Sequence, residues 1–147
     1  MSVRNTIRQS LVNGDLNFIE NMAQGGGNVY RTLSSLLYDD DILVRWRAID
    51  GMGKASRIIA GTDIEKVRRQ VRRILWLMND ESGGLCWNGP EAIAEIVFNV
   101  PSLIEEYGKI LISFLAEEPF QAGTRRGIAR IGQMEPGLFA ESAKYLG

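Results

Sequence analysis

Apolar side chains recur along the chain every three or four residues, the spacing of one face of an α-helix. The clearest case is residues 63–78. At about 100° per residue, the apolar side chains of this segment fall on one side of a helix, and they are Ile64, Val67, Val71, Ile74, Leu75 and Met78. Arginines occupy the opposite side, with Trp76 among them. No alternation typical of a strand exceeds four residues. The pattern therefore predicts an all-α chain.

Glycine, proline and small polar residues divide this pattern into helices. The predicted segments are 2–12, 15–24, 28–38, 42–60, 63–78, 88–100, 102–116, 123–134 and 136–146. Asp15 is predicted to accept hydrogen bonds from the free amides of the second helix, and Thr62 and Ser102 to begin capping boxes. The acidic corner at 39–41 is also interpreted as capping rather than as a cation site.

The helices form pairs that repeat along the chain. An acidic residue lies at the end of each of three predicted helices, 28–38, 63–78 and 102–116. Aligning these acids gives steps of 41 and 37 residues, with a basic residue eight positions before each acid. The acids are Asp39, Asp80 and Glu117, and the basic residues are Arg31, Arg72 and Lys109. Trp46 and Trp87 each follow their acid by seven residues, so both tryptophans are predicted to anchor corners. A period near 40 residues with two helices is typical of an α-solenoid.

Three stretches carry a resemblance to a known family. LVRWRAIDGMGKAS, GPEAIAEIV and RRGIARIG resemble first helices of HEAT-like (armadillo-type) repeats of the phycobilisome-lyase kind. The resemblance covers about residues 15–146, and it implies a right-handed α-α superhelix, a short α-solenoid of about four HEAT-like helix pairs in a single domain, 1–147. Such families include scaffolds, bilin lyases, a metal-dependent hydroxylase and DNA alkylation-repair glycosylases, so the resemblance alone does not choose a function.

Composition narrows the chemistry. The chain has 147 residues, no histidine and one cysteine, Cys86. It can form no intrachain disulfide, and it lacks the usual ligands for zinc, iron or copper and the usual residue for acid–base catalysis. We therefore expect no metal, no cofactor and no catalytic residue, and we favour binding over enzymatic activity. No apolar run reaches the length of a membrane helix, and residues 1–13 do not resemble a secretory signal, so a cytoplasmic protein without a membrane partner is expected.

Charge is distributed unevenly, although the net charge is only −1. Residues 31–73 contain ten Lys/Arg against six Asp/Glu, a net +4, whereas residues 74–122 contain one against eight, a net −7. The second helices of the repeats are expected to form a concave face for a partner protein. Its predicted binding residues are Arg31, Arg69, Arg72, Arg73 and Trp76. Trp76 could instead pack beneath the next repeat. The arginines of 125–130 are expected to pair with the acids just before them.

The irregular stretch 79–90 is a second candidate site, because long connections in repeat proteins often lie on a binding edge. Its residues of interest are Asp80, Glu81, Trp87 and Asn88. Two carboxylates beside a tryptophan could bind a cationic group, and Asp80 with Glu81 could form a catalytic pair. Acids recur at the equivalent positions of the other repeats, however, which favours a structural corner.

Three functions fit these observations. The first is a protein-interaction adaptor or scaffold that uses the concave face. The second is nucleic-acid binding or DNA alkylation repair, suggested by arginines and tryptophans but opposed by an isoelectric point near 5.5 and the acidic section. The third is a lyase-like helper for a cofactor-bearing protein. Another protein is the expected partner, and the sequence indicates no oligomeric state.

Overall fold

The computed structural model describes residues 2–79 and 86–133, and every regular element in this part is helical. The α-helices are α1 (Val3–Asn13), α2 (Asn17–Gln24), α3 (Val29–Leu36), α4 (Ile42–Ala60), α5 (Ile64–Leu77), α6 (Gly89–Asn99), α7 (Ile104–Ser113) and α8 (Gln121–Gly132). Two short 3-10 helices, η2 (Pro101–Leu103) and η3 (Phe114–Ala116), flank α7. The prediction of an all-α chain is confirmed over these residues. The helix predicted at 136–146 lies outside them.

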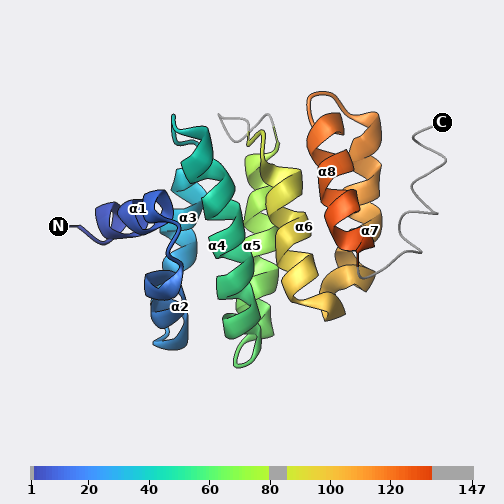
Figure 1. The fold of residues 1–147 in the computed structure, drawn as a ribbon. Helices are drawn as coiled ribbons and strands as arrows, with labels where there is room; N and C mark the ends of the chain where they lie inside the picture. Colours follow the sequence, from blue (N-terminus) through green and yellow to red (C-terminus); the bar gives the residue numbers. More distant parts are fainter. Residues whose placement is uncertain (1, 80–85, 134–147) are drawn as a thin grey trace.

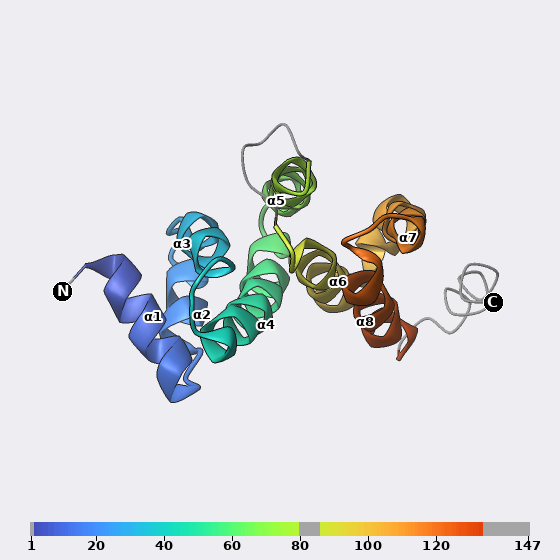
Figure 2. The same cartoon turned by 90° about the horizontal axis from the view of Figure 1, so that it is seen from above.

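The helices lie in two layers, which Figure 1 shows from the side and Figure 2 from above. Helices α2, α4, α6 and α8 form the first layer, in which α6 packs extensively on both α4 and α8. Helices α3, α5 and α7 form the second layer. Each of them packs on the first layer and makes far fewer contacts with its neighbours in its own layer. Helix α1 lies across the N-terminal end, against α4.

The apolar stripes of the helices meet between the two layers, as their spacing predicts. On α4 the buried side chains recur every three or four residues and include Val44, Ala48, Met52, Ala55 and Ile59. Helix α6 is buried on nearly every side, because it lies between α4, α8, α5 and α7. The apolar spacing of residues 102–116 predicts that Ile110 also faces inward, and this prediction is wrong. Ile110 of α7 is 40% exposed, because few contacts join α7 to its neighbour in the second layer and this side of α7 stays open.

Glycines allow the helices of the first layer to approach closely. A β-carbon on Gly53 of α4 would lie 2.5 Å from Asn99 Nδ2 and 3.2 Å from the backbone oxygen of Glu95, both on α6. A β-carbon on Gly127 of α8 would lie 2.9 Å from the β-carbon of Ala94. These crossings leave no room for a side chain, so they fix the spacing of the first layer.

The helix starts agree with the sequence at two corners. Asp15 accepts a hydrogen bond from the Asn17 amide at 2.9 Å, as predicted. Asp41 caps α4 by accepting from the Leu43 amide at 2.9 Å. Asp39 accepts from the Asp41 amide at 2.9 Å, so this acidic corner is organised by backbone amides.

The two predicted capping boxes are wrong. Asp63, not Thr62, caps α5, because the turn after α4 still includes Thr62, whose hydroxyl donates to the Ile59 carbonyl at 3.3 Å. Ser102 lies inside η2, whose hydrogen bond from the Leu103 amide to the Val100 carbonyl is 3.0 Å long. Helix α7 continues directly from this 3-10 turn and has no side-chain cap.

An ion pair joins α1 to the corner between α3 and α4. Arg8 donates through Nε to Asp39 Oδ2 at 2.8 Å and through Nη2 to Oδ1 at 3.0 Å. The Arg8 hydrogen bond, supported by the Asp41 amide, lowers the pKa of Asp39 to about 2. A free aspartate has a pKa of about 3.9. The pair should therefore stabilise the fold at neutral pH.

We expect this stabilisation to be present above pH 4 and to disappear as the pH falls toward 2, because the folded state must then protonate a carboxylate that it prefers ionised. In urea melts at pH 5 and pH 3, the wild type should lose more stability than the Arg8→Met variant, which lacks the pair. Arg125→Met serves as a control and should follow the wild type. An equal loss in Arg8→Met would contradict this assignment.

Candidate binding groove between α3 and α5

The sparse packing between α3 and α5 leaves a groove of about 820 Å³ on the second layer. Its lining comes from one side of each helix and from the turn that follows α3. The lining residues are Asn28, Tyr30, Arg31, Ser34, Ser35, Tyr38, Lys66, Arg69, Gln70, Arg73 and Leu77. On α5 they recur every three or four residues, so a single helical face points into the groove.

The inner wall of the groove is polar and held by hydrogen bonds. Gln70 Nε2 donates to Ser34 Oγ at 2.9 Å, which ties α5 to α3. The Tyr30 and Ser56 hydroxyl oxygens are 2.7 Å apart, which ties α3 to α4. Burial raises the pKa of Tyr30 to about 12. Because these partners are buried and satisfied, the wall is a fixed surface.

The outer part of the groove is cationic. Arg31, Lys66, Arg69 and Arg73 line it, and its lining contains no carboxylate. Among the described residues, Arg31, Lys66 and Arg73 form no ion pair. Arg69 lies 3.8 Å from Asp63, and both side chains are more than half exposed, so water screens this pair. The groove therefore presents cations that the rest of the fold leaves largely uncommitted.

Two aromatic side chains lie at this surface. Tyr38 lines the groove and is 46% exposed. Burial, followed by the neighbouring Cys86, raises the pKa of Tyr38 to about 12. Trp76 is 47% exposed on α5. The interpretation in which Trp76 packs beneath the next repeat is wrong, because the second-layer helices are too far apart to cover it.

The predicted partner-binding residues do not all lie at the same site in the structure. Arg31, Arg69 and Arg73 line the groove, whereas Trp76 lies beside it on the outer surface of α5. Arg72 does not line the groove; it lies toward α7, where its positive charge opposes the rise that burial causes in the pKa of Tyr107. One step of about 100° separates it from Arg73, which is enough to turn it to the other side of α5.

Arg68 also faces α7. It bonds Glu106 with an Nη2–Oε1 distance of 2.7 Å, and it contacts Glu65 on its own helix. Sequence reasoning missed Lys66, Tyr38 and Gln70 as groove residues. The spacing of Lys66, Gln70 and Arg73 along one face of α5 was the available signal.

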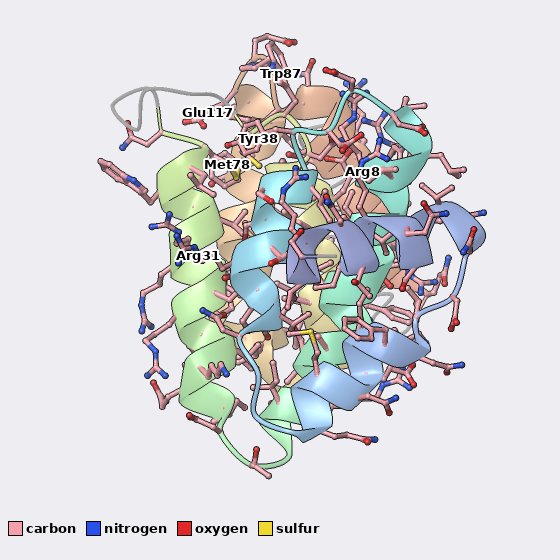
Figure 3. All side chains as sticks on the ribbon, turned by 90° about the vertical axis from the view of Figure 1, so that its left-hand side faces the viewer. Arg8, Arg31, Tyr38, Met78, Trp87 and Glu117 are labelled. Carbon is pink, nitrogen blue, oxygen red and sulfur yellow. The ribbon has the colours of Figure 1, made fainter. Side chains whose placement is uncertain are left out.

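The second predicted site is only partly described. Asp80 and Glu81 lie outside the described residues. Asn88 precedes α6, and its amide donates to Glu91 Oε2 at 3.2 Å, so it has a structural partner. Trp87 is 62% exposed. Figure 3 shows it at one end of the molecule.

The prediction that Trp87 anchors a buried corner is therefore wrong. Its counterpart Trp46 lies within α4 and packs partly against the core, with the Arg126 guanidinium 5.6 Å from the centre of a Trp46 ring. Trp87 precedes α6, whereas Trp46 lies within α4. The two tryptophans therefore have different surroundings, although each follows its aligned acid by seven residues.

Helix α8 pairs its arginines with α6, not with the acids that precede it. Arg126 Nη2 lies 2.9 Å from Glu91 Oε2, and Arg130 Nε lies 2.9 Å from Glu95 Oε2. The expected pairing with the preceding corner is wrong, because the close crossing of the two helices places these arginines over the polar side of α6. Both glutamates are buried and committed to the fold.

Across 2–79 and 86–133, no group of three or more histidine, cysteine or acidic side chains is arranged to hold a metal ion. Among the described helices, none combines the length and apolar character required to span a membrane.

Comparison with known proteins shows a partial similarity. An uncharacterized protein from Archaeoglobus fulgidus is 35% identical to the chain over 83 residues, which are 56% of this chain and 42% of that protein. The chain thus matches less than half of the length of this relative. No family model matches the chain. No solved structure matches it significantly.

Proposed function

We propose that this protein is a protein-interaction adaptor that binds an acidic segment of a partner protein in the groove between α3 and α5. The observation that carries this proposal is the unbalanced charge of the groove. Four cationic side chains line it without a carboxylate, and three of them have no ion pair within the described residues. Arginine and lysine that lack internal partners are suited to bind carboxylates of a second molecule.

The proposed architecture is a short right-handed superhelix of about four HEAT-like helix pairs. The two-layer arrangement and the resemblance of residues 43–56, 89–97 and 125–132 to HEAT-like first helices support it. In such a superhelix the second helices form the concave face on which partner segments bind. Helices α3 and α5, which form the groove, occupy this second layer.

Nucleic acid is a second candidate ligand, favoured by the exposed Trp76 on an arginine-rich helix, where a base could stack. The charge of the surroundings favours protein instead. A duplex contacts phosphates over a long surface, and residues 74–122, which follow the basic groove residues in the chain, carry a net charge of −7. A short acidic peptide, by contrast, could bind within the basic groove without reaching the acidic section.

Fluorescence anisotropy with a labelled peptide of alternating glutamate and tyrosine tests the proposal. Arg31→Gln and Arg73→Gln should each weaken binding by about tenfold, because each removes a charge-assisted hydrogen bond. Arg125→Gln is the matched control, since this exposed arginine lies on α8 away from the groove, and it should bind as the wild type does. Higher salt should weaken wild-type binding.

Two results would contradict the proposal. One is a peptide affinity that is the same in the wild type and in the Arg31 and Arg73 variants. The other is arginine-dependent binding of a labelled DNA duplex or single strand that is tighter than the binding of the peptide at the same salt concentration. The second result would identify nucleic acid as the ligand of the groove.

A further inference from the structure

A second groove, of about 580 Å³, lies on the other side of α5 from the basic groove. It separates the C-terminal end of α5 from the turn between α7 and α8. Its apolar lining includes Leu75, Met78, Phe114 and Phe120, and its carboxylates are those of Glu117 and Glu118. Figure 3 shows Met78 and Glu117 near this end of α5, and Arg31 beside the body of the helix.

The chemistry of this second groove is complementary to a long cationic side chain. Phe114 and Phe120 pack edge to face, with ring centroids 5.8 Å apart, and form an aromatic wall. Glu117 and Glu118 are exposed, and neither forms an ion pair among the described residues. A lysine or arginine could lay its aliphatic stem on the apolar wall and place its charge at the carboxylates.

Helix α5 links the two grooves. Arg69 and Arg73 point into the basic groove, whereas Leu75 and Met78 line the acidic one. The exposed Trp76 occupies the position between these two sets. A helix with its side chains is about 10–12 Å wide, and an extended peptide advances about 3.3 Å per residue. About four residues of a bound segment would therefore cross α5 over Trp76.

We propose that the two grooves bind a single segment of the partner protein that carries both negative and positive charges. An acidic stretch of this segment occupies the basic groove, and a lysine or arginine about four residues away occupies the acidic groove. This inference rests on the proposed function, because it extends the ligand of the same basic groove. The observation behind it is independent, since the second groove contributes its own carboxylates and its own aromatic wall.

The arrangement also selects against other acidic ligands. A polyanion that extends past Trp76 brings negative charge to Glu117 and Glu118, and like charges repel. A segment that changes sign at this point avoids the repulsion and gains a second anchor. The two grooves therefore read the order of charges in a partner as well as its net charge.

The test compares three labelled peptides by fluorescence anisotropy. The first is an acidic block of six glutamate and tyrosine residues, followed by four Gly/Ser residues and two serines. The second replaces the two serines with lysines, and the third has the same residues as the second in the reverse order. In at least one order, lysine should raise the affinity of the wild type by about threefold to tenfold.

The variant Glu117→Gln/Glu118→Gln should remove this gain while it leaves the affinity for the serine peptide unchanged. Trp76→Ala should reduce the gain, because the crossing residues lose their contact. Glu20→Gln, on α2, is the matched control and should keep the full gain. A melt of each variant confirms that it is folded.

The inference is overturned if lysine gives no gain in either order, or if the gain survives in the double glutamine variant. Both results leave the proposed function intact when the serine peptide still binds through Arg31 and Arg73. Failure of the serine peptide to bind, or binding that does not depend on these arginines, overturns the proposed function and this inference together.

Discussion

Replacing Gly53 with alanine should lower the free energy of unfolding by about 1–3 kcal/mol, because the added methyl group overpacks the crossing of α4 and α6. The neighbouring atoms cannot simply move away. Asn99 Nδ2 donates to the Glu95 carbonyl at 2.9 Å, and Arg57 Nη2 donates to Asn99 Oδ1 at 2.8 Å. A shift of Asn99 would break these bonds inside the protein. Urea melts followed by circular dichroism measure the effect.

Gly25→Ala is the matched control for this substitution. Gly25 has a φ of −82°, and an added β-carbon would have its nearest contact at 3.4 Å, with the Asn21 carbonyl. Alanine fits there without strain, so the stability should change little or rise slightly. Equal unfolding midpoints for Gly53→Ala and Gly25→Ala would show that the first layer is not held by close glycine crossings.

Replacing Arg126 with methionine should lower the free energy of unfolding by about 2–3 kcal/mol. Arg126 is the principal partner of Glu91, whose side chain is 5% exposed and whose Oε1 has no hydrogen-bond partner. Without the arginine, a buried carboxylate keeps only the Asn88 amide, at 3.2 Å from Oε2. The loss should fall below that of a fully buried pair, because the Arg126 side chain is 55% exposed.

A double variant separates the lost charge from lost packing. Glu91→Gln added to Arg126→Met removes the unpaired charge and should restore part of the stability. Arg125→Met changes the neighbouring exposed arginine and should melt as the wild type does. If Arg126→Met and Arg125→Met have the same unfolding midpoint, the ion pair between α6 and α8 contributes nothing to stability.

The helices themselves could be predicted because their signals are local. Helix α4 begins and ends where the sequence indicates, at residues 42–60, because Asp41 supplies the cap and Gly61 ends the apolar pattern. The two capping boxes failed because a cap depends on where the preceding turn ends. Thr62 still belongs to the turn after α4, and Ser102 lies in a 3-10 turn, neither of which a four-residue motif specifies.

The candidate site could be predicted only on the helix that carries it. The helical periodicity of residues 63–78 predicts which arginines share the polar side of α5. It does not predict which of them face α3 and which face α7. Arg72 therefore joined the predicted face although it does not line the groove and lies on the side of α5 toward Tyr107 of α7. The second groove was missed for the same reason, since Phe114 and Glu118 meet α5 only after α7 and α8 have packed.

The separation of the two layers has a consequence for how such a protein could acquire new partners. The closely crossed helices α4, α6 and α8 contain the glycines and the buried ion pairs whose disruption should lower the stability of the fold. The groove residues Arg31, Lys66 and Arg73 make no ion pair among the described residues and leave that first layer untouched. Substitutions at these outer groove positions of α3 and α5 could therefore redirect the protein to different ligands while its melting temperature stays nearly constant.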